Sequence, residues 1–555
     1  MSFIDTDGSN SNSFQHGSKL YVILLTIVAT LGGLLFGYDT AVVNGAEKSL
    51  VEFYIYKTSG NSYIFDLNTV TQLFTQYRIM MVIVLYLVFI VLSGQFIRLF
   101  GKKRGGIITA VILGGLTIWA VRFITNALPD FNDIEAMKNM ADAVKGFVIS
   151  SALIGCIIGG AAAGFVSKSL GRKNGLFIAG IAFFISAIGA WKPEQFNVFG
   201  TLDVYSFVFY RIICGLGVGL ASMISPMYIA EIAPANVRGK LVSFNQFAII
   251  LGMLVIHIIN LKISRLGDDQ WLLTEGWRLM FLSAVIPSGI FILILIFIPE
   301  TPRYLAMKGN DKKALSVLQK LSGNSEAHHI LKDIKGTLHE PNAPWLSYGV
   351  GVIIIGVLLS VFQQAVGINA VLYYAGNIFR NNGATTDSSL FQTIIVAIVN
   401  LAFTVLAIMT VDKFGRKPLM IIGSIGMAVS MLGLGFTFYY GHLGLFALIF
   451  ILTYIAAFAM SWGPVCWVLL SEIFPNSIRG ALSIAVAAQW IANWIVSFTF
   501  PMLNDNVWLT NTFHHGFAYW IYGIMCILSA LFMWKFVPET KGKTLESIEK
   551  LWIKK

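Results

Sequence analysis

Long apolar runs, separated by short polar or basic segments, are the main pattern along this chain. Fourteen runs are long enough to cross a bilayer, which takes about 20 mostly apolar residues. They lie near residues 20–44, 72–97, 106–125, 147–169, 175–191, 204–230, 241–261, 278–298, 348–378, 389–411, 418–439, 443–470, 482–502 and 518–537. A membrane helix satisfies its own backbone hydrogen bonds. The pattern therefore predicts an all-α polytopic membrane protein with 14 spans.

Composition and charge narrow the class of protein further. Only 12% of the 555 residues are charged and 56% are hydrophobic, whereas soluble proteins carry about 25% charged residues. These values exclude a disordered chain and a single soluble core. The net charge of +11 comes from basic residues clustered in short loops, which membrane topology explains better than nucleic acid does. We expect no nucleic-acid partner and a lipid bilayer around the spans.

The short loops predict the orientation of the chain. Lys and Arg concentrate on the cytoplasmic side of membrane proteins. Residues 98–104, 171–173 and 415–417 are basic, whereas 126–146 carries four acidic residues. This distribution places the basic loops inside, the 126–146 loop outside and both termini in the cytoplasm. Residues 1–18 lack an apolar core and a cleavage site, so the first span is expected to act as an uncleaved anchor.

Three short motifs occur twice, offset by about 240 residues. The pairs are Glu231 and Arg238-Gly239 with Glu472 and Arg479-Gly480, Gly171-Arg172-Lys173 with Gly415-Arg416-Lys417, and Pro299-Glu300-Thr301 with Pro538-Glu539-Thr540. One duplication explains all three offsets. It predicts two helical halves with the same membrane orientation, and such parallel repeats are a transporter architecture with the substrate site between the halves.

Four short motifs in this chain resemble those of a known family. Gly37-Tyr38-Asp39, Pro299 to Arg303, Gln363-Gln364 with Gly367-Ile368-Asn369, and Pro538 to Gly542 resemble the signatures of the sugar porter family of the major facilitator superfamily. The resemblance covers 20–45 and 147–550, and residues 460–475 are very similar to its xylose-transporting members. It implies twelve core helices in a six-plus-six arrangement, alternating access and a bacterial inner-membrane location.

Residues 46–146 depart from the family pattern. About 100 residues with two extra apolar runs stand where the family has a short connection. We predict an inserted helical hairpin, copied from or mimicking the next helix pair, that packs on the lipid-facing side of the N-terminal half. Alternatively, the shared glycines and basic residues are only what any cytoplasmic turn carries. The predicted divisions are 1–45 (tail and first core helix), 46–146 (insert), 147–299 (rest of the N-terminal half), 300–346 (cytoplasmic linker) and 347–555 (C-terminal half and tail).

Asp39 is the candidate proton carrier, with Arg211 as its partner. Each lies in an otherwise apolar run, and a charge at bilayer depth costs at least about 2.5–3.5 kcal/mol, so it usually faces a cavity or a partner. By resemblance, proton-coupled members carry Asp at this position and facilitative members tend to carry Asn. Ala284 stands where a xylose-transporting member has a membrane carboxylate, so the relay rests on Asp39 and Arg211. The alternative is that Asp39 is merely solvated near the outer interface.

Buried amides and aromatic rings are the candidate sugar contacts. Amides match sugar hydroxyls without stranding a charge, and a helix break near Gly367 would bring three of them together. The resemblance places the sugar contacts at Gln246, Gln363, Gln364, Asn369, Trp467, Gln489 and Trp490, with Tyr373 and Gly463 nearby; Asn400 is added from its intramembrane position. The alternative role of a lone amide is an interhelical hydrogen bond. Met253 stands where the xylose-transporting members have a second glutamine, so hexoses are alternative candidate substrates.

A third set of charged residues is expected to control opening on the cytoplasmic side. By resemblance, the set comprises Arg172, Glu231, Arg238, Arg416, Glu472 and Arg479. We expect ion pairs among them to hold the two halves together and to break as the protein opens inward. Lys168 replaces the family's aspartate before the first Gly-Arg-Lys, while the second copy keeps Asp412. Alternatively, the basic residues of this set only hold the helix ends on the cytoplasmic side, as the positive-inside rule describes.

The sequence therefore predicts uptake of a monosaccharide by proton symport, with D-xylose as first candidate. The alternatives are a facilitative uniporter, a glucose- or galactose–proton symporter and, more remotely, a non-transporting sugar sensor. No phosphate-binding loop or metal-ligand spacing is present, so we expect no enzyme activity, no cofactor and no metal. The four cysteines lie in apolar runs and are expected to be packed thiols. We expect a monomer.

Overall fold

The computed structural model describes residues 18–541 except 60–61, 199, 235–236, 339–343, 382, 384, 443, 475–477 and 479–480, and it also describes residue 552. In that part of the chain, 13 helices are long and apolar enough to cross a membrane. One of them, α2 (Leu67–Thr125), consists of two helices joined at Gly101. Counting both arms of α2 gives the fourteen predicted crossings.

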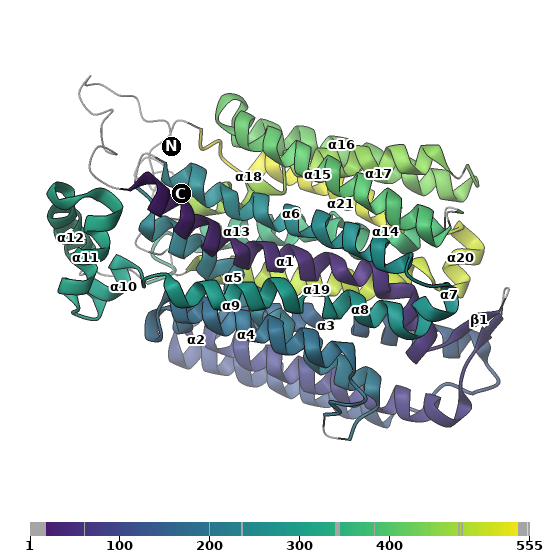
Figure 1. The fold of residues 1–555 in the computed structure, drawn as a ribbon. Helices are drawn as coiled ribbons and strands as arrows, with labels where there is room; N and C mark the ends of the chain where they lie inside the picture. The colour runs from purple at the N-terminus through teal and green to yellow at the C-terminus, as the bar shows by residue number, and fades with distance from the viewer. Residues whose placement is uncertain are drawn as a thin grey trace.

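The core helices run side by side as one elongated bundle (Figure 1). The N-terminal half comprises α1 (Lys19–Tyr54), α3 (Ile134–Ser169), α4 (Arg172–Trp191), α5 (Asp203–Ile232), α6 (Arg238–Ser264), and a sixth span made of α7 (Asp269–Trp271), the π-helical η1 (Leu272–Gly276), α8 (Trp277–Leu282) and α9 (Val285–Phe297). The C-terminal half comprises α13 (Val350–Ala365), α14 (Ile368–Asn381), α15 (Thr386–Phe414), α16 (Arg416–Tyr439), α17 (Leu445–Met460), α18 (Pro464–Ile473), α19 (Leu482–Asn504), α20 (Val507–Phe513) and α21 (Phe517–Phe536).

Short elements mark the two ends of the bundle. The connection between the halves forms α10 (Pro302–Met307), α11 (Asp311–Ser322) and α12 (Asn324–Leu338), which gather at one end, called here the linker end (Figure 1). The strands β1 (Lys57–Ser59) and β2 (Ser62–Ile64) pair antiparallel at the opposite end, called here the hairpin end, where α20 also lies. The sequence did not predict this small β-hairpin.

The insert is a helical hairpin, as predicted. Gly101 takes φ 79° and ψ 164°, a conformation that favours glycine because it has no Cβ. The duplicated turns use almost the same backbone, with φ 99° at Gly171 and 92° at Gly415. The two arms of α2 touch through the hydroxyls of Tyr86 and Thr117, which lie 2.8 Å apart. Whether the hairpin was copied from its neighbour or only mimics it stays a prediction.

The insert packs against the outer face of the N-terminal half, also as predicted. The ring of Tyr77 lies 5.6 Å from that of Phe147 on α3. The side chain of Gln76 accepts a hydrogen bond of 2.9 Å from the backbone N–H of Leu202, at the start of α5. Large apolar side chains such as Ile83 and Ile90 stay exposed on α2. Since lipid is as apolar as these side chains, they suit a helix that faces the bilayer.

Glycines bring α3 and α5 into direct backbone contact. A Cβ built at Gly215 would lie 1.7 Å from the carbonyl oxygen of Ala152, and one at Gly155 would lie 2.0 Å from that of Ile212. Small residues allow the two backbones to approach closely, and the resulting van der Waals packing stabilises the helix pair. This packing matters because the hydrophobic effect does not drive helices together inside a membrane. The close contact fixes α5, and with it Arg211, relative to α3.

We expect Gly215→Ala to destabilise the protein. The new methyl group has to displace backbone, and overpacking of this kind costs about 1–3 kcal/mol or more. Thermal unfolding of the detergent-solubilised protein should therefore shift to lower temperature. Gly114→Ala is the matched control, because a Cβ at Gly114 meets nothing within 4 Å. Equal melting temperatures for the two variants would contradict the proposed close packing.

The structure corrects the predicted external loop at 126–146. Helix α3 already begins at Ile134, so only the first part of this segment is a loop. Asp142, which the sequence placed in a solvated acidic loop, is completely buried beside Lys138. Several acidic residues in one short segment normally indicate solvent exposure, but Asp142 is paired with Lys138, and pairing makes burial of a charge tolerable.

Candidate functional site

A helix break places three of the predicted amides in one cluster. Helix α13 ends at Ala365 and α14 begins at Ile368, and between them Gly367 takes φ +95°. The side-chain amide of Asn369 donates to Gln364 Oε1 at 2.6 Å, and that of Gln364 donates to Gln363 Oε1 at 3.0 Å. The break predicted near Gly367 is therefore present, and it turns Asn369 toward the two glutamines.

A fourth amide joins this cluster from α19. Gln489 Nε2 donates to Gln363 Oε1, while Gln363 Nε2 donates to the backbone oxygen of Trp462 at 3.2 Å. Gln363, Gln364 and Gln489 are all buried. The Oε1 atom of Gln489 is buried without a hydrogen-bond partner among the described residues. Buried polar atoms are normally satisfied, so this acceptor is available to a hydroxyl-bearing ligand.

The two predicted tryptophans lie on α18 and α19, which both pack against α13 of the cluster. Trp490 follows Gln489 on α19, is buried, and lies 5.8 Å from the ring of Phe36 on α1, so it reaches across the boundary between the halves. Trp467 lies on α18 and is 37% exposed. A second interrupted helix positions it, because α17 ends at Met460 and α18 begins only after Gly463. These rings and amides have the polar and apolar faces that a sugar ring needs.

The other two predicted amide contacts, Gln246 and Asn400, lie on different helices from the cluster. Gln246 is half-buried on α6, and Met253 is buried seven residues further along the same helix. Asn400 is buried on α15. Within the described part of the chain, no hydrogen bond connects Gln246 or Asn400 to the four amides. Their assignment as sugar contacts therefore stays a prediction.

Asp39 of α1 and Arg211 of α5 form a buried ion pair. The guanidinium also lies over the ring of Phe281, with its carbon 5.3 Å from the ring centre. A cavity of about 10 Å³ adjoins the pair and is lined by both charged residues and by Ala284. That volume is about the size of one water molecule. Removing one partner would leave a buried charge uncompensated, which is strongly unfavourable.

Helix α14, which carries Asn369, is hydrogen-bonded to α1, which carries Asp39. The side chain of Asn44 on α1 donates to the backbone oxygen of Leu372 at 2.9 Å and accepts from the backbone N–H of Gly376 at 3.0 Å. Tyr373 is buried between these two positions, one helical turn after Asn369 and on the same face of α14.

The charged residues at the linker end form ion pairs inside each half, and the predicted pairs between the halves, which are expected to break on inward opening, stay a prediction. Glu231 accepts from Arg172 at 2.8 Å and from the Thr301 hydroxyl at 2.6 Å, all within the N-terminal half. The C-terminal half repeats this arrangement with Arg416 at 3.0 Å and Thr540 at 2.6 Å from Glu472. The reason is local: each pair connects the first turn of one helix to the end of another helix in the same repeat.

For two of the predicted gating residues the structure provides no evidence of a gating role. Arg238 is exposed at the start of α6, while Arg479 lies outside the described residues, as does the side chain of Asp412. Lys168 is exposed near the end of α3. The gating roles of Arg238 and Arg479 therefore stay predictions.

The sequence reasoning missed what the repeated Pro-Glu-Thr motif does. Glu300 Oε1 accepts the backbone N–H of Arg172 at 3.1 Å, and Glu539 Oε1 accepts that of Arg416 at 3.2 Å. Each glutamate therefore caps the N-terminus of α4 or α16, where a negative charge is favoured. Burial nevertheless raises the pKa of Glu300, more than these hydrogen bonds lower it. The strict repetition of the motif was the signal that could have revealed this capping role.

Comparison with known proteins agrees with this geometry. The profile of the family "Sugar (and other) transporter" matches residues 25–552. The chain is 50% identical to the D-xylose-proton symporter of Escherichia coli, over 97% of each protein. It is 40% identical to the glucose facilitated diffusion protein of Zymomonas mobilis, over 74% of this chain and 88% of that protein. It is 39% identical to the arabinose-proton symporter of Bacillus subtilis, over 80% of this chain and 93% of that one.

Solved structures give the same result. The partially occluded inward-open conformation of the E. coli xylose transporter XylE matches with a TM-score of 0.73 and 47% identity, covering 95% of this chain and 100% of that chain. The same transporter bound to 6-bromo-6-deoxy-D-glucose matches with a TM-score of 0.71 and 49% identity, covering 96% and 99%. The matched residues include both halves and both candidate sites, and the chain therefore belongs to the sugar transporter family of the major facilitator superfamily.

Proposed function

We propose that this protein carries a monosaccharide into the cell together with a proton, and that D-xylose is the first sugar to test. The observation that carries this proposal is the combination of an uncharged amide cluster with a buried Asp39–Arg211 pair on α1, a helix that is hydrogen-bonded to α14 of the cluster. An uncharged amide cluster fits sugar hydroxyls, and a buried carboxylate beside an arginine fits a proton site. Relatives that bear the names of xylose and arabinose proton symporters support the assignment.

The proposed orientation places the linker end in the cytoplasm. The basic segments 102–104, 172–173 and 416–417 follow the turns at Gly101, Gly171 and Gly415, and basic loops favour the cytoplasmic side. Both termini would then lie in the cytoplasm of a bacterial inner membrane, while the β-hairpin would lie outside.

In the proposed cycle a proton from outside binds Asp39 and weakens its pairing with Arg211. The sugar then enters between the halves and binds the amides and tryptophans. The halves rock, and proton and sugar leave on the cytoplasmic side. An inward-moving proton gains about 2.3 kcal/mol per 100 mV of membrane potential, which can drive the sugar uphill.

A uniporter is the second candidate, and one observation favours it. Ala284 lines the cavity beside Asp39, so this cavity lacks the second carboxylate that the resemblance to xylose-transporting members leads one to expect. Asp39 would then only hold α1 to α5 through Arg211.

Proton movement separates the two candidates. We expect external alkalinisation when xylose, glucose, galactose or arabinose is added, one at a time, to energised cells that make the protein. The sugar that gives the largest pH change identifies the substrate, and a hexose is the expected alternative because Met253 makes the wall of the site more apolar. Sugar uptake without any pH change would eliminate symport and leave the uniporter.

A further inference from the structure

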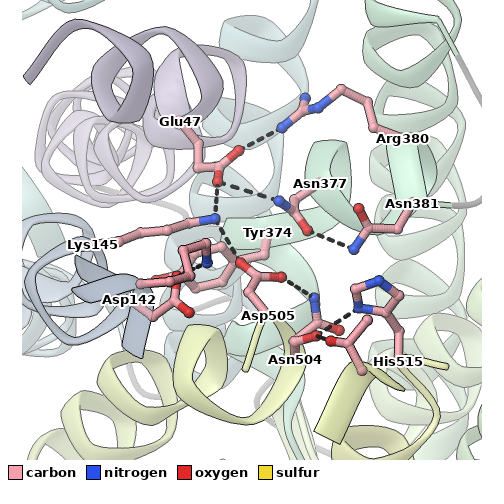
Figure 2. Close-up of polar contacts among 12 residues, drawn as sticks. Glu47, Asp142, Lys145, Tyr374, Asn377, Arg380, Asn381, Asn504, Asp505 and His515 are labelled. Atoms are coloured by element: carbon pink, nitrogen blue, oxygen red, sulfur yellow. Dashed lines mark hydrogen bonds and ion pairs between the residues drawn. The ribbon is translucent and has the colours of Figure 1, made fainter. Parts of the chain in front are cut away.

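Six charged side chains meet at the hairpin end, outside both candidate sites. They are Glu47, Lys138, Asp142, Lys145, Arg380 and Asp505, called here the hairpin-end charge cluster (Figure 2 shows all but Lys138 with labels). Lys145 Nζ lies 2.7 Å from Glu47 Oε1 and 2.9 Å from Asp505 Oδ2. The other oxygen of Glu47 lies 2.5 Å from Arg380. Three basic and three acidic side chains thus meet in the cluster.

The cluster crosses the boundary between the halves. Glu47 lies on α1 and Lys145 on α3, whereas Arg380 lies on α14 and Asp505 caps the end of α19. Two ion pairs, Glu47–Arg380 and Lys145–Asp505, therefore connect one half to the other. By contrast, the linker-end pairs described above each stay within one half.

The charges are buried, so these ion pairs are not ordinary surface contacts. The side chains of Glu47 and Lys145 are only 2% and 3% exposed. Burial raises the pKa of Asp505, but Lys145 and Lys138 outweigh this effect and lower the pKa to about 2. Asp505 is therefore ionised at physiological pH. Separating the halves at this end would force the cluster to exchange every cross-boundary partner for water, and removing one partner would leave the others buried and unpaired.

Core helices of the N-terminal half carry four of the six charges. Glu47 lies on α1, and Lys138, Asp142 and Lys145 lie on the first part of α3. The β-hairpin region between α1 and α2 covers one side of the cluster, because the rings of Tyr56 and Tyr63 lie 5.1 and 4.9 Å from Lys138 Nζ. Both tyrosines belong to the β-hairpin region, and a ring face attracts an ammonium group.

Uncharged contacts continue the same junction. The backbone oxygen of Leu372 accepts the Asn44 side chain at 2.9 Å, and the backbone N–H of Gly376 donates to Asn44 Oδ1 at 3.0 Å. On the other side of the cluster, Asn506 donates to Asn139 Oδ1 at 2.8 Å. The junction therefore runs from α1 and α14 across to α3 and the segment after α19.

We propose that the hairpin-end charge cluster is a latch that holds the protein closed toward the outside. This inference rests on the proposed alternating access and assigns a conformational function to buried charges on α1, α3 and α14 and at the end of α19. Opening toward the outside requires both cross-boundary ion pairs to break. The latch therefore shifts the equilibrium toward the inward-facing state, and the outward-facing state is correspondingly less populated.

Distance measurements between two spin labels test the latch. Labels at Asn132 and Asn511, both exposed at the hairpin end on opposite halves, report whether that end is open; the four native cysteines are buried. In Glu47→Gln and Lys145→Met we expect the long-distance population to rise at least about tenfold, because each leaves buried charges without a partner. Asp387→Asn is the matched control. It breaks the Arg265–Asp387 pair, which also joins the halves but is more than half exposed, and should change the population by less than about twofold.

The second step of the test guards against a folding defect. Asp505→Asn alters the other end of the Lys145 ion pair, at a position that follows a helix rather than inside one. In the double variant with Lys145→Met, the shift should be smaller than the product of the two single fold-changes, because the residues act on each other. Unchanged distances in folded single variants, or fully multiplicative effects, would overturn the latch. The labels report opening even if no sugar is transported, so failure of the proposed function is distinguished by the pH assay.

Discussion

Asp39→Asn is expected to abolish uphill sugar accumulation while leaving downhill exchange within about threefold of the unaltered protein. Asn keeps the shape of the side chain and can still accept a hydrogen bond from Arg211, but it cannot ionise. Loss of the proton removes about 2.3 kcal/mol of driving force at 100 mV, which corresponds to a roughly fiftyfold sugar gradient. The internal sugar concentration should therefore only reach the external one.

Two assays on the same vesicles measure this effect. Accumulation is measured with an imposed proton gradient, and exchange is measured as counterflow of labelled sugar without a gradient. Asp130→Asn is the control, because Asp130 lies in the exposed loop before α3 and its side chain accepts only local hydrogen bonds from Asn132. Continued uphill uptake in Asp39→Asn would refute the coupling role of this carboxylate, whereas loss of exchange as well would indicate a structural role for the Asp39–Arg211 pair.

The helices and the centre of the site could be predicted because their signals are local in the sequence. An apolar run is visible in any 20-residue window, and Gly367 marks its helix break within two residues of Asn369. The contact between Asp39 and Arg211 could also be anticipated, because a membrane interior offers a buried carboxylate few other partners.

The hairpin-end charges could not be found in this way. Lys145 and Asp505 are partners although 360 residues separate them, and no local pattern records such a pairing. In sequence, Asp142 and Lys145 resemble a solvated loop, and the burial of Lys145 is explained only by its partners Glu47 on α1 and Asp505 at the end of α19. At the linker end the resemblance gave residues that do form ion pairs, and their observed partners lie within one half because the duplicated motif builds each cluster locally.

The uncharged network around Gln363 has a direct consequence for binding. Gln364 accepts from Asn369 and donates to Gln363, so it holds both neighbours in place in addition to offering its own amide. Truncation to alanine removes one ligand contact and releases two other side chains. A site that hydrogen-bonds the hydroxyl groups of its substrate binds much more weakly when one of those hydrogen bonds is lost, because buried polar groups are then left unpaired.

We therefore expect Gln364→Ala to weaken sugar binding by about 10- to 100-fold, since one to two neutral hydrogen bonds of about 0.5–1.5 kcal/mol each are lost together with the positions of their neighbours. Calorimetric titration of the purified protein measures this change directly. Gln392→Ala is the matched control, because it removes an amide from the same half of the protein. Gln392 lies outside the cluster and contacts Ser388 on its own helix at 3.4 Å. If both variants bind the sugar equally well, the pocket lies elsewhere. If only Gln364→Ala is impaired, the helix break at Gly367 is where the sugar is held, and the hydrogen bonds between α14 and α1 then connect the sugar site to the helix that carries Asp39.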